Sequence, residues 1–388
     1  MNKIIISLAL LVASADATAD NPLSCTLGVL QDLGWSIEKT SGEPGVLNTD
    51  TCASSSSPIF TYNDITESNL DILKRSEAAL ADTATRCLVN RRYKTAASQA
   101  VGKLTANTEF TFPLKAPDPR DPFLPPAENW IPSSKRGYDI PLNSISEGVN
   151  ALYEKPFVAE CATAIQIAQL AVLTEHYGPF TDAMLDPSDI GIGIWREYAK
   201  NPSIAAKTPL LIDSSRRKYP LKALAELGKG AFYGQTGYIR SVKSEEFIDS
   251  IDNIGQNFLI VDISDAAVTA LQSRDKPLRE INSISHRAWK RYNKLLSKGG
   301  DKKFLSSALR IELEASDPFF SDVDVYVHPL KVKSFAAHLE RQFLFNPRTP
   351  FEFEIYEDYQ SGYFHERYVN YRLNQCTGQS YCRKINRK

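Results

Sequence analysis

The chain has 388 residues, a length that corresponds to about two or three domains. Hydrophobic residues make up 43% and charged residues 23%, which is typical of globular proteins and excludes a disordered or collagen-like chain. The 45 basic and 46 acidic residues leave a net charge of −1. The overall charge therefore gives no reason to expect nucleic acid or an anionic membrane as the main partner.

Residues 1–19 have the features of a secretory signal peptide: Lys3 at the start, an apolar run over 4–13, and small residues at 17–19 for cleavage before Asp20. The apolar run, at about ten residues, is too short to span a bilayer as a helix. No later segment reaches the roughly 18 consecutive apolar residues of a membrane helix. We therefore expect a secreted or periplasmic protein without a transmembrane segment.

Six cysteines are compatible with disulfides in an exported protein. Their spacing suggests two pairs, Cys25 with Cys52 and Cys376 with Cys382. If all six pair, Cys161 is structural. If Cys161 is a functional thiol, one of the other five stays single, and we expect that one to be Cys87. No CxxC or His-rich spacing supports a zinc site, and we expect no metal or other cofactor.

The segment 20–140 is expected to form an N-terminal region. Its clearest element is a helix over 66–87, where apolar residues recur at nearly every 3.6 positions. Seven prolines then fall within 113–132, which predicts an extended and non-helical linker. This linker is a domain boundary, a strap across a surface, or the border of a pro-segment.

The segment 141–275 is expected to form a domain with one long helix over 159–177, which Gly178 and Pro179 end. Strands and a helix capped by Ser244 follow. The predicted strands cover 190–195, 209–212, 221–227, 231–242 and 258–263, and the capped helix covers 244–255. A helix that leads into an antiparallel sheet indicates an α+β fold.

The segment 276–388 is expected to form a smaller α+β lobe for substrate or partner contact. Its predicted helices cover 278–296 and 333–343, and its predicted strands cover 309–313, 323–328, 351–357 and 363–373.

Cys161 begins the long predicted helix, where unpaired N–H groups and the positive end of the helix dipole stabilise a thiolate. Such a position lowers the pKa of a cysteine and makes it a nucleophile at neutral pH. The alternatives are a buried structural residue and a disulfide partner of Cys87.

The run FVAECATAI over 157–165 resembles the nucleophile segment of the bacterial spore-coat transglutaminases. A second run, LGKGAFYGQTG over 227–237, is similar to a turn and hairpin of that family. The resemblance covers roughly residues 140–272. It implies a papain-like, NlpC-related fold and a protein-glutamine γ-glutamyltransferase, with Cys161 as the nucleophile and Glu160 as the family's functional glutamate.

In such an enzyme the Cys161 thiolate attacks a glutamine side-chain amide, ammonia leaves, and a lysine amine takes the acyl group. The expected partners are therefore protein substrates that carry Gln and Lys. Acyl transfer also needs an acid and base for the amines and donors for the oxyanion. The backbone N–H of Cys161 is a natural oxyanion donor.

The chain departs from the family at two positions. Lys222 stands where the family has the acidic base, so the base is either Lys222 or Glu226, four residues along the same predicted strand. Gln235 stands where the family has a histidine, and it can donate to an oxyanion but cannot carry a proton at pH 7. Trp195 flanks a strand expected to face the helix, as core or as substrate wall.

No histidine completes an obvious Cys-His pair. His176 is expected at the C-terminal end of the Cys161 helix and His286 on a solvated helix face. One of the three histidines in the last segment could still reach across to the thiol: His328, His338 or His365. Two alternative functions therefore stay open: a glutamine deamidase toxin or cell-wall cysteine peptidase, and a catalytically inactive binding module.

Overall fold

A computed structural model describes the following residues: 22–47, 57–111, 123–132, 138–140, 144–185, 191–192, 221–242, 245–250, 255–328, 330–355 and 365–377. The predicted signal peptide, Cys52, Trp195 and Cys382 lie outside these residues. The described elements have the mixed α+β composition that the sequence predicts.

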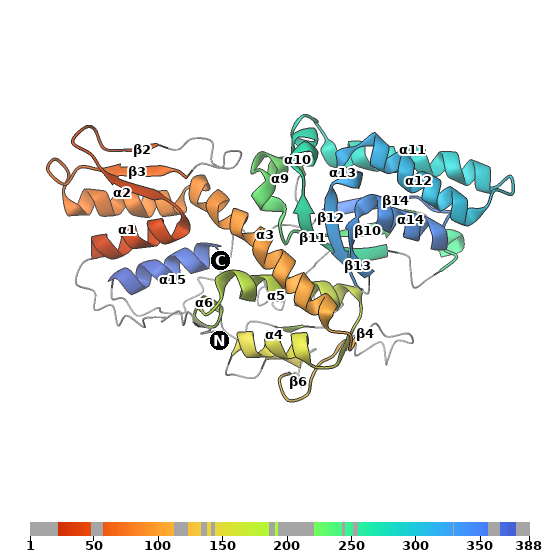
Figure 1. Cartoon of the computed structure of the whole chain (residues 1–388), viewed down its shortest axis with the longest axis horizontal. Helices are drawn as coiled ribbons and strands as arrows, with labels where there is room; N and C mark the ends of the chain where they lie inside the picture. Colours follow the sequence, from red (N-terminus) through yellow and green to blue (C-terminus); the bar gives the residue numbers. More distant parts are fainter. Residues whose placement is uncertain are drawn as a thin grey trace, which may run out of the picture.

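The N-terminal layer combines both ends of the described chain (Figure 1). Its strand β3 pairs in parallel with β1 and antiparallel with β2. Helix α15 packs against α1, although the two are far apart in sequence. The layer consists of α1 (Pro22–Leu33), β1 (Ser36–Lys39), β2 (Gly45–Leu47), β3 (Ile59–Tyr62), α2 (Asn69–Ala81) and α15 (His365–Thr377).

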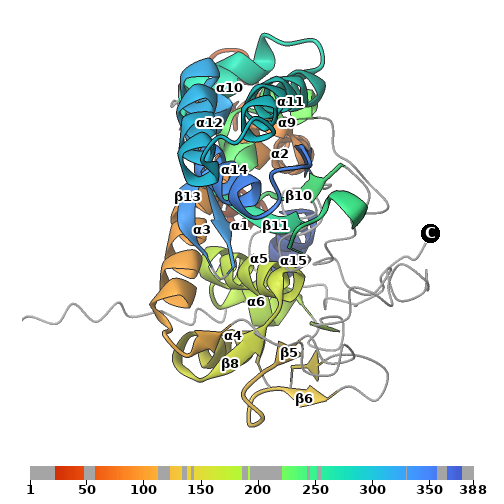
Figure 2. The same cartoon turned by 90° about the vertical axis from the view of Figure 1, so that its right-hand side faces the viewer.

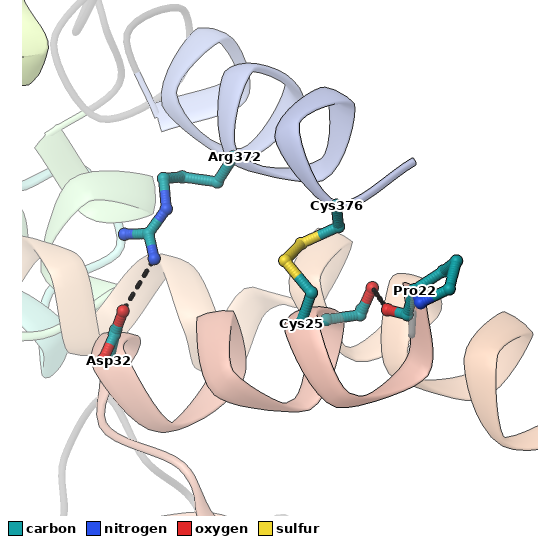
Figure 3. Close-up of a disulfide and its surroundings, with 6 residues drawn as sticks. Pro22, Cys25, Asp32, Arg372 and Cys376 are labelled. Atoms are coloured by element: carbon teal, nitrogen blue, oxygen red, sulfur yellow. Dashed lines mark hydrogen bonds and ion pairs between the residues drawn. A yellow bond between two sulfur atoms is a disulfide. The ribbon is translucent and has the colours of Figure 1, made fainter. Parts of the chain in front are cut away.

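A disulfide between Cys25 of α1 and Cys376 of α15 connects these two helices (Figure 3). The same two helices are also joined by Arg372 of α15, which donates a hydrogen bond to the Asp32 carboxylate of α1 at 2.7 Å. The predicted pairs of Cys25 with Cys52 and of Cys376 with Cys382 are therefore wrong, because the fold brings together cysteines that are 351 positions apart.

Cys87 is also disulfide-bonded, to a partner outside the described residues. The expectation that Cys87 stays single is wrong as well. Cys161 is a free thiol.

Helices α3 (Thr83–Ala106) and α5 (Cys161–Tyr177) form the centre of the molecule and pack along each other. Helix α5 is buried on nearly all sides, because α3, α4 and the largest sheet surround it. Smaller elements complete this part: α4 (Ile145–Glu154), α6 (Phe180–Met184), β4 (Phe110–Thr111), β5 (Phe123–Leu124), β8 (Phe157–Ala159), β6 (Ile131–Pro132), β7 (Tyr138–Asp139) and β9 (Gly191–Ile192).

The largest sheet has five strands in the order β13-β12-β11-β10-β14. Its neighbouring strands are all antiparallel. The strands are β10 (Thr236–Ser241), β11 (Gly255–Ile263), β12 (Val323–Val327), β13 (Leu330–Ser334) and β14 (Phe351–Ile355). Its strands β11 and β10 come from the predicted segment 141–275 and lie between strands of the segment 276–388, so the expected border at 275 passes through one sheet.

Alternation along the strands gives this sheet two different faces. One face turns Thr236 and Asn257 toward α5, and Gln169 of α5 donates to the Thr236 hydroxyl at 3.2 Å. The other face packs Phe258 and Phe353 on Phe335, with ring centroids 4.9 Å and 4.8 Å apart. Figure 2 shows α5 and α14 on opposite sides of β10 and β11.

Helices of the last third cover the second face and the β14 edge. Asn282 of α11 accepts from the Phe353 N–H at 2.9 Å and donates to its carbonyl at 3.2 Å, which satisfies the backbone of this edge strand. These helices are α10 (Asp265–Gln272), α11 (Pro277–Leu296), α12 (Lys302–Ser316), α13 (Pro318–Ser321) and α14 (Phe335–Phe345), while α9 (Leu221–Glu226) precedes β10 and contacts α10 and α11.

Three predicted strands are helices in the structure. Residues 221–226, 309–313 and the described part 365–373 of these segments fall in α9, α12 and α15. In α12 the buried Leu305, Leu309 and Leu313 recur every four residues, a helical period that the short window 309–313 hides.

Two predicted helices also differ from the structure. The helix expected over 66–87 is two helices, because Asp82 ends α2 and caps α3. Within the segment 244–255, the described residues 245–247 form only a short 3₁₀ turn. The helices expected over 159–177 and 278–296 are confirmed as α5 and α11.

Candidate functional site

Glu160 and Cys161 form the start of α5, and Glu160 is its N-cap residue. The Glu160 carboxylate accepts from the backbone N–H groups of Ala162 at 2.9 Å and Thr163 at 2.7 Å, and from the Thr163 hydroxyl at 2.8 Å. The Cys161 thiol donates to the same carboxylate over 3.4 Å. The residue pair predicted from the sequence is thus in direct contact.

Burial, together with the charge of Glu160, reverses the expected effect of the helix start on the thiol. Burial raises the pKa of Cys161 to about 12, and the adjacent Glu160 carboxylate adds to this rise. Hydrogen bonds from Asn257 act in the opposite direction but are weaker. At pH 7 Cys161 is therefore a protonated thiol, and the prediction of a preformed thiolate is wrong. A proton acceptor, the Glu160 carboxylate, is already in hydrogen-bond contact with it.

Asn257 and Tyr238 line the sheet surface below the thiol. The Asn257 amide nitrogen lies 3.9 Å from the Cys161 sulfur. Tyr238 is the register partner of Asn257 on β10. Its ring lies over Gly255, where a side chain would collide with the phenol oxygen, so a glycine at 255 makes room for it. Burial raises the pKa of Tyr238 to about 12, and the negative charges that Cys161 and Glu354 carry at that high pH add to this rise.

Sequence reasoning missed Asn257 and Tyr238. The alternation in 236–241 already places Thr236, Tyr238 and Arg240 on one face of a strand. Their proximity to Cys161 depends on how β10 and β11 pair under α5, which that pattern does not encode.

A row of charged side chains continues from Tyr238 toward the β14 edge. Arg240 forms ion pairs with Glu354 at 2.8 Å and Glu352 at 3.1 Å. Glu354 is buried, so its charge needs this partner. His286 of α11 lies 3.3 Å from Glu352, and burial lowers its pKa, so it is mainly neutral at pH 7. The expectation of a solvated His286 is wrong, because the residue is half-buried against β14.

His328 crosses from the last segment to the β4–β8 region but does not reach the thiol. It follows β12, stacks on Phe110 with centroids 3.9 Å apart, and hydrogen-bonds to the backbone of Thr111 and Ala159. Burial lowers its pKa to about 4. A neutral His328 thus holds β8, the strand that leads into Glu160, and no contact joins it to the thiol. His338 lies on the opposite sheet face, where its ring approaches the Val325 carbonyl at 3.4 Å.

The remaining predicted site residues are not assembled around Cys161. Lys222 and Glu226 lie on helix α9, where Lys222 is partly exposed and Glu226 is exposed. Neither contributes to the electrostatics of the thiol. Gln235 is buried and donates to the carbonyl of Thr236 at 3.0 Å, so its amide is directed at the backbone next to it.

The Cys161 N–H is in the first turn of α5, and no acceptor for it occurs among the described residues. This donor is available to an oxyanion beside the sulfur, as the sequence predicts.

A cavity of about 620 Å³ opens beside this row, between α9, the start of α11 and β14. Its walls include Lys222, His286 and Glu352. Lys222, expected as a base, is therefore part of a cavity wall.

No family model, no curated protein and no solved structure matches the chain. Within the described ranges, no helix is long and apolar enough to cross a membrane. Nor does this part of the chain bring three or more His, Cys, Asp or Glu side chains together as a metal site.

Proposed function

We propose that the protein is a cysteine acyltransferase that cross-links protein glutamine to lysine through a thioester on Cys161. The observation that carries this proposal is the contact of the Cys161 thiol with the Glu160 carboxylate at 3.4 Å, at the start of a helix packed on an antiparallel sheet. A thiol at a helix start that faces polar strand residues supports a papain-like fold, which the resemblance of the 157–165 run also implies.

In the proposed reaction, Glu160 is the base. As the sulfur attacks the glutamine amide carbon, its proton moves to Glu160, because a thiol with a pKa of about 12 does not ionise beforehand. The N–H of Cys161 and the Asn257 amide, 3.9 Å from the sulfur, are the donors for the oxyanion. The C–N bond then breaks, and Glu160 returns the proton to the leaving ammonia.

The second half of the reaction uses the same groups. A lysine amine attacks the thioester carbon, and Glu160 accepts a proton from this amine. The C–S bond breaks, and the thiolate is reprotonated. The products are an isopeptide bond and free Cys161. If water takes the place of the amine, the products are glutamate and free Cys161, which is the reaction of a deamidase.

The raised pKa of Cys161 also favours a second candidate, a binding module that keeps the fold without the chemistry. The disulfide between α1 and α15 supports an oxidising compartment, and hence secretion or a periplasmic location, for either candidate.

The test measures ammonia release and the incorporation of a fluorescent primary amine into a glutamine-containing protein, with the full chain and with Cys161→Ala. We expect both signals for the wild type and neither for the variant. Ammonia without incorporated amine would identify a hydrolase. Absence of both signals from folded wild-type protein would contradict the proposal and favour the binding module.

A further inference from the structure

The cavity beside β14 has the size of a ligand site. Its volume of about 620 Å³ falls in the usual range for sites of small molecules and peptide side chains. Part of its wall is apolar, formed by Leu221 of α9 and by Pro277 and Leu278 of α11. The other lining residues are polar or charged, so the cavity is suited to an occupant that has both apolar and polar or charged groups.

The unpaired charges of this cavity are mostly positive. Lys222, Lys276 and Arg279 line it, and none of them forms an ion pair with another described residue. Of the two acids in the wall, Glu352 shares Arg240 with Glu354, and the exposed Asp275 forms no ion pair with another described residue.

The first turn of α11 adds to this positive potential. Its N-cap, Lys276, makes no side-chain cap, and position N1 is a proline. The N–H groups of Leu278 and Arg279 in the cavity wall therefore have no acceptor among the described residues. Charge complementarity thus favours an anionic occupant.

The cavity and the thiol lie on the same face of the sheet. Asn257 contacts the thiol, Tyr238 pairs with Asn257, and Glu354 pairs with Tyr238. Glu352, in the cavity wall, is two residues from Glu354 on β14. Two strand spacings and two residues of rise separate Asn257 from Glu352 by roughly 12 Å. An extended chain of about four residues covers this distance.

From this geometry we propose that the cavity binds an acidic segment of the glutamine-donor protein, about three to five residues from the reactive glutamine. Carboxylates of the segment pair with Lys222, Lys276 and Arg279, and a neighbouring apolar side chain packs on Leu221 and Leu278. This inference deepens the proposed function and rests on it for the role of Cys161.

The test measures peptide binding by the full-length Cys161→Ala protein, so that no turnover is needed. One peptide has a glutamine followed, after three residues, by Glu-Leu-Glu, and a second has Lys-Leu-Lys in the same place. We expect only the acidic peptide to bind, and its affinity to fall with added salt. The double substitution Lys222→Gln and Arg279→Gln is expected to weaken binding about tenfold.

Arg287→Gln is the matched control, because Arg287 is exposed on α11 outside the cavity wall. We expect this variant to bind as the parent does. Equal binding of both peptides, or an affinity that the double substitution leaves unchanged, would overturn the proposal. Binding of a free dicarboxylate as tight as that of the peptide would overturn the assignment to a polypeptide.

Failure of the proposed function gives a different result. If the peptides bind in a charge-dependent way but the wild type incorporates no amine, the acidic-segment site is supported and the proposed reaction is contradicted. If the wild type incorporates amine into both peptides at equal kcat/KM, the proposed reaction is supported and the proposed site for an acidic segment is contradicted.

Discussion

The two faces of the five-stranded sheet differ in what they bury. The face toward α5 buries polar groups, among them Asn257 and Glu354, around a thiol with a raised pKa. The opposite face buries aromatic rings, with Phe335 in contact with Phe258, Phe319 and Phe353. Burial of polar groups costs free energy unless they are paired, whereas burial of rings stabilises the fold. We infer that the polar face is kept for chemistry and the aromatic face for stability.

The largest effect is expected from Glu160→Gln on the polar face. Loss of the base lowers the rate of amine incorporation by about 10²- to 10⁴-fold. Loss of the negative charge also lowers the pKa of Cys161, so its alkylation by iodoacetamide at pH 7 becomes faster. Activity and thiol reactivity thus change in opposite directions, and both are measured on the same preparation.

Glu226→Gln is the matched control for this test, since Glu226 is an exposed carboxylate on α9. We expect this variant to keep its amine incorporation. A loss as large as that of Glu160→Gln would assign the base to Glu226, the alternative that the sequence leaves open.

The aromatic face is tested by Phe335→Ala. Removal of this buried ring is expected to lower the free energy of unfolding by about 3–5 kcal/mol, measured by urea denaturation. Tyr238→Phe is the comparison on the polar face, and loss of one hydroxyl there is expected to cost less than about 1.5 kcal/mol. If Tyr238→Phe is the more destabilising of the two, the division between the faces is wrong.

The last effect concerns the pH dependence of stability and His338, which is buried behind the aromatic face and whose pKa burial lowers to about 4. The folded protein binds this proton less readily than the unfolded chain, so stability falls as the pH drops from about 6.5 toward 4. Between pH 7 and pH 4, the free energy of unfolding of His338→Leu is expected to fall by up to about 3 kcal/mol less than that of the wild type, measured by denaturation at both pH values. An unchanged difference between the two pH values would contradict a buried neutral His338.

Local signals explain which elements the sequence predicts. Helix α5 is confirmed because its apolar residues, its Glu160 cap and its glycine end all lie within one segment. Strand β14 is confirmed because 351–355 alternates strictly. The aromatic and β-branched residues around Tyr368 and Val369 favour a strand, but α15 is a helix, with Val369, Leu373 and Cys376 at helical spacing and α1 packed against it.

The candidate site was predicted in part for the same reason. Glu160 and Cys161 are adjacent, so their contact follows from the sequence. Asn257 approaches the sulfur only through the packing of β11 on α5, and the sign of the pKa shift depends on a burial that no local pattern reports. The pairing of Cys25 with Cys376 is equally non-local.

This disulfide changes what proteolytic processing of the chain would produce. A single cut anywhere between Cys25 and Cys376 leaves both fragments covalently attached, because the bond closes a loop of nearly the whole chain. If the proline-rich segment is the border of a pro-segment, cleavage there yields a two-chain protein whose fragments separate only after reduction. The N-terminal fragment, with α1, α2 and the central helix α3, would then remain on the mature protein as a tethered light chain.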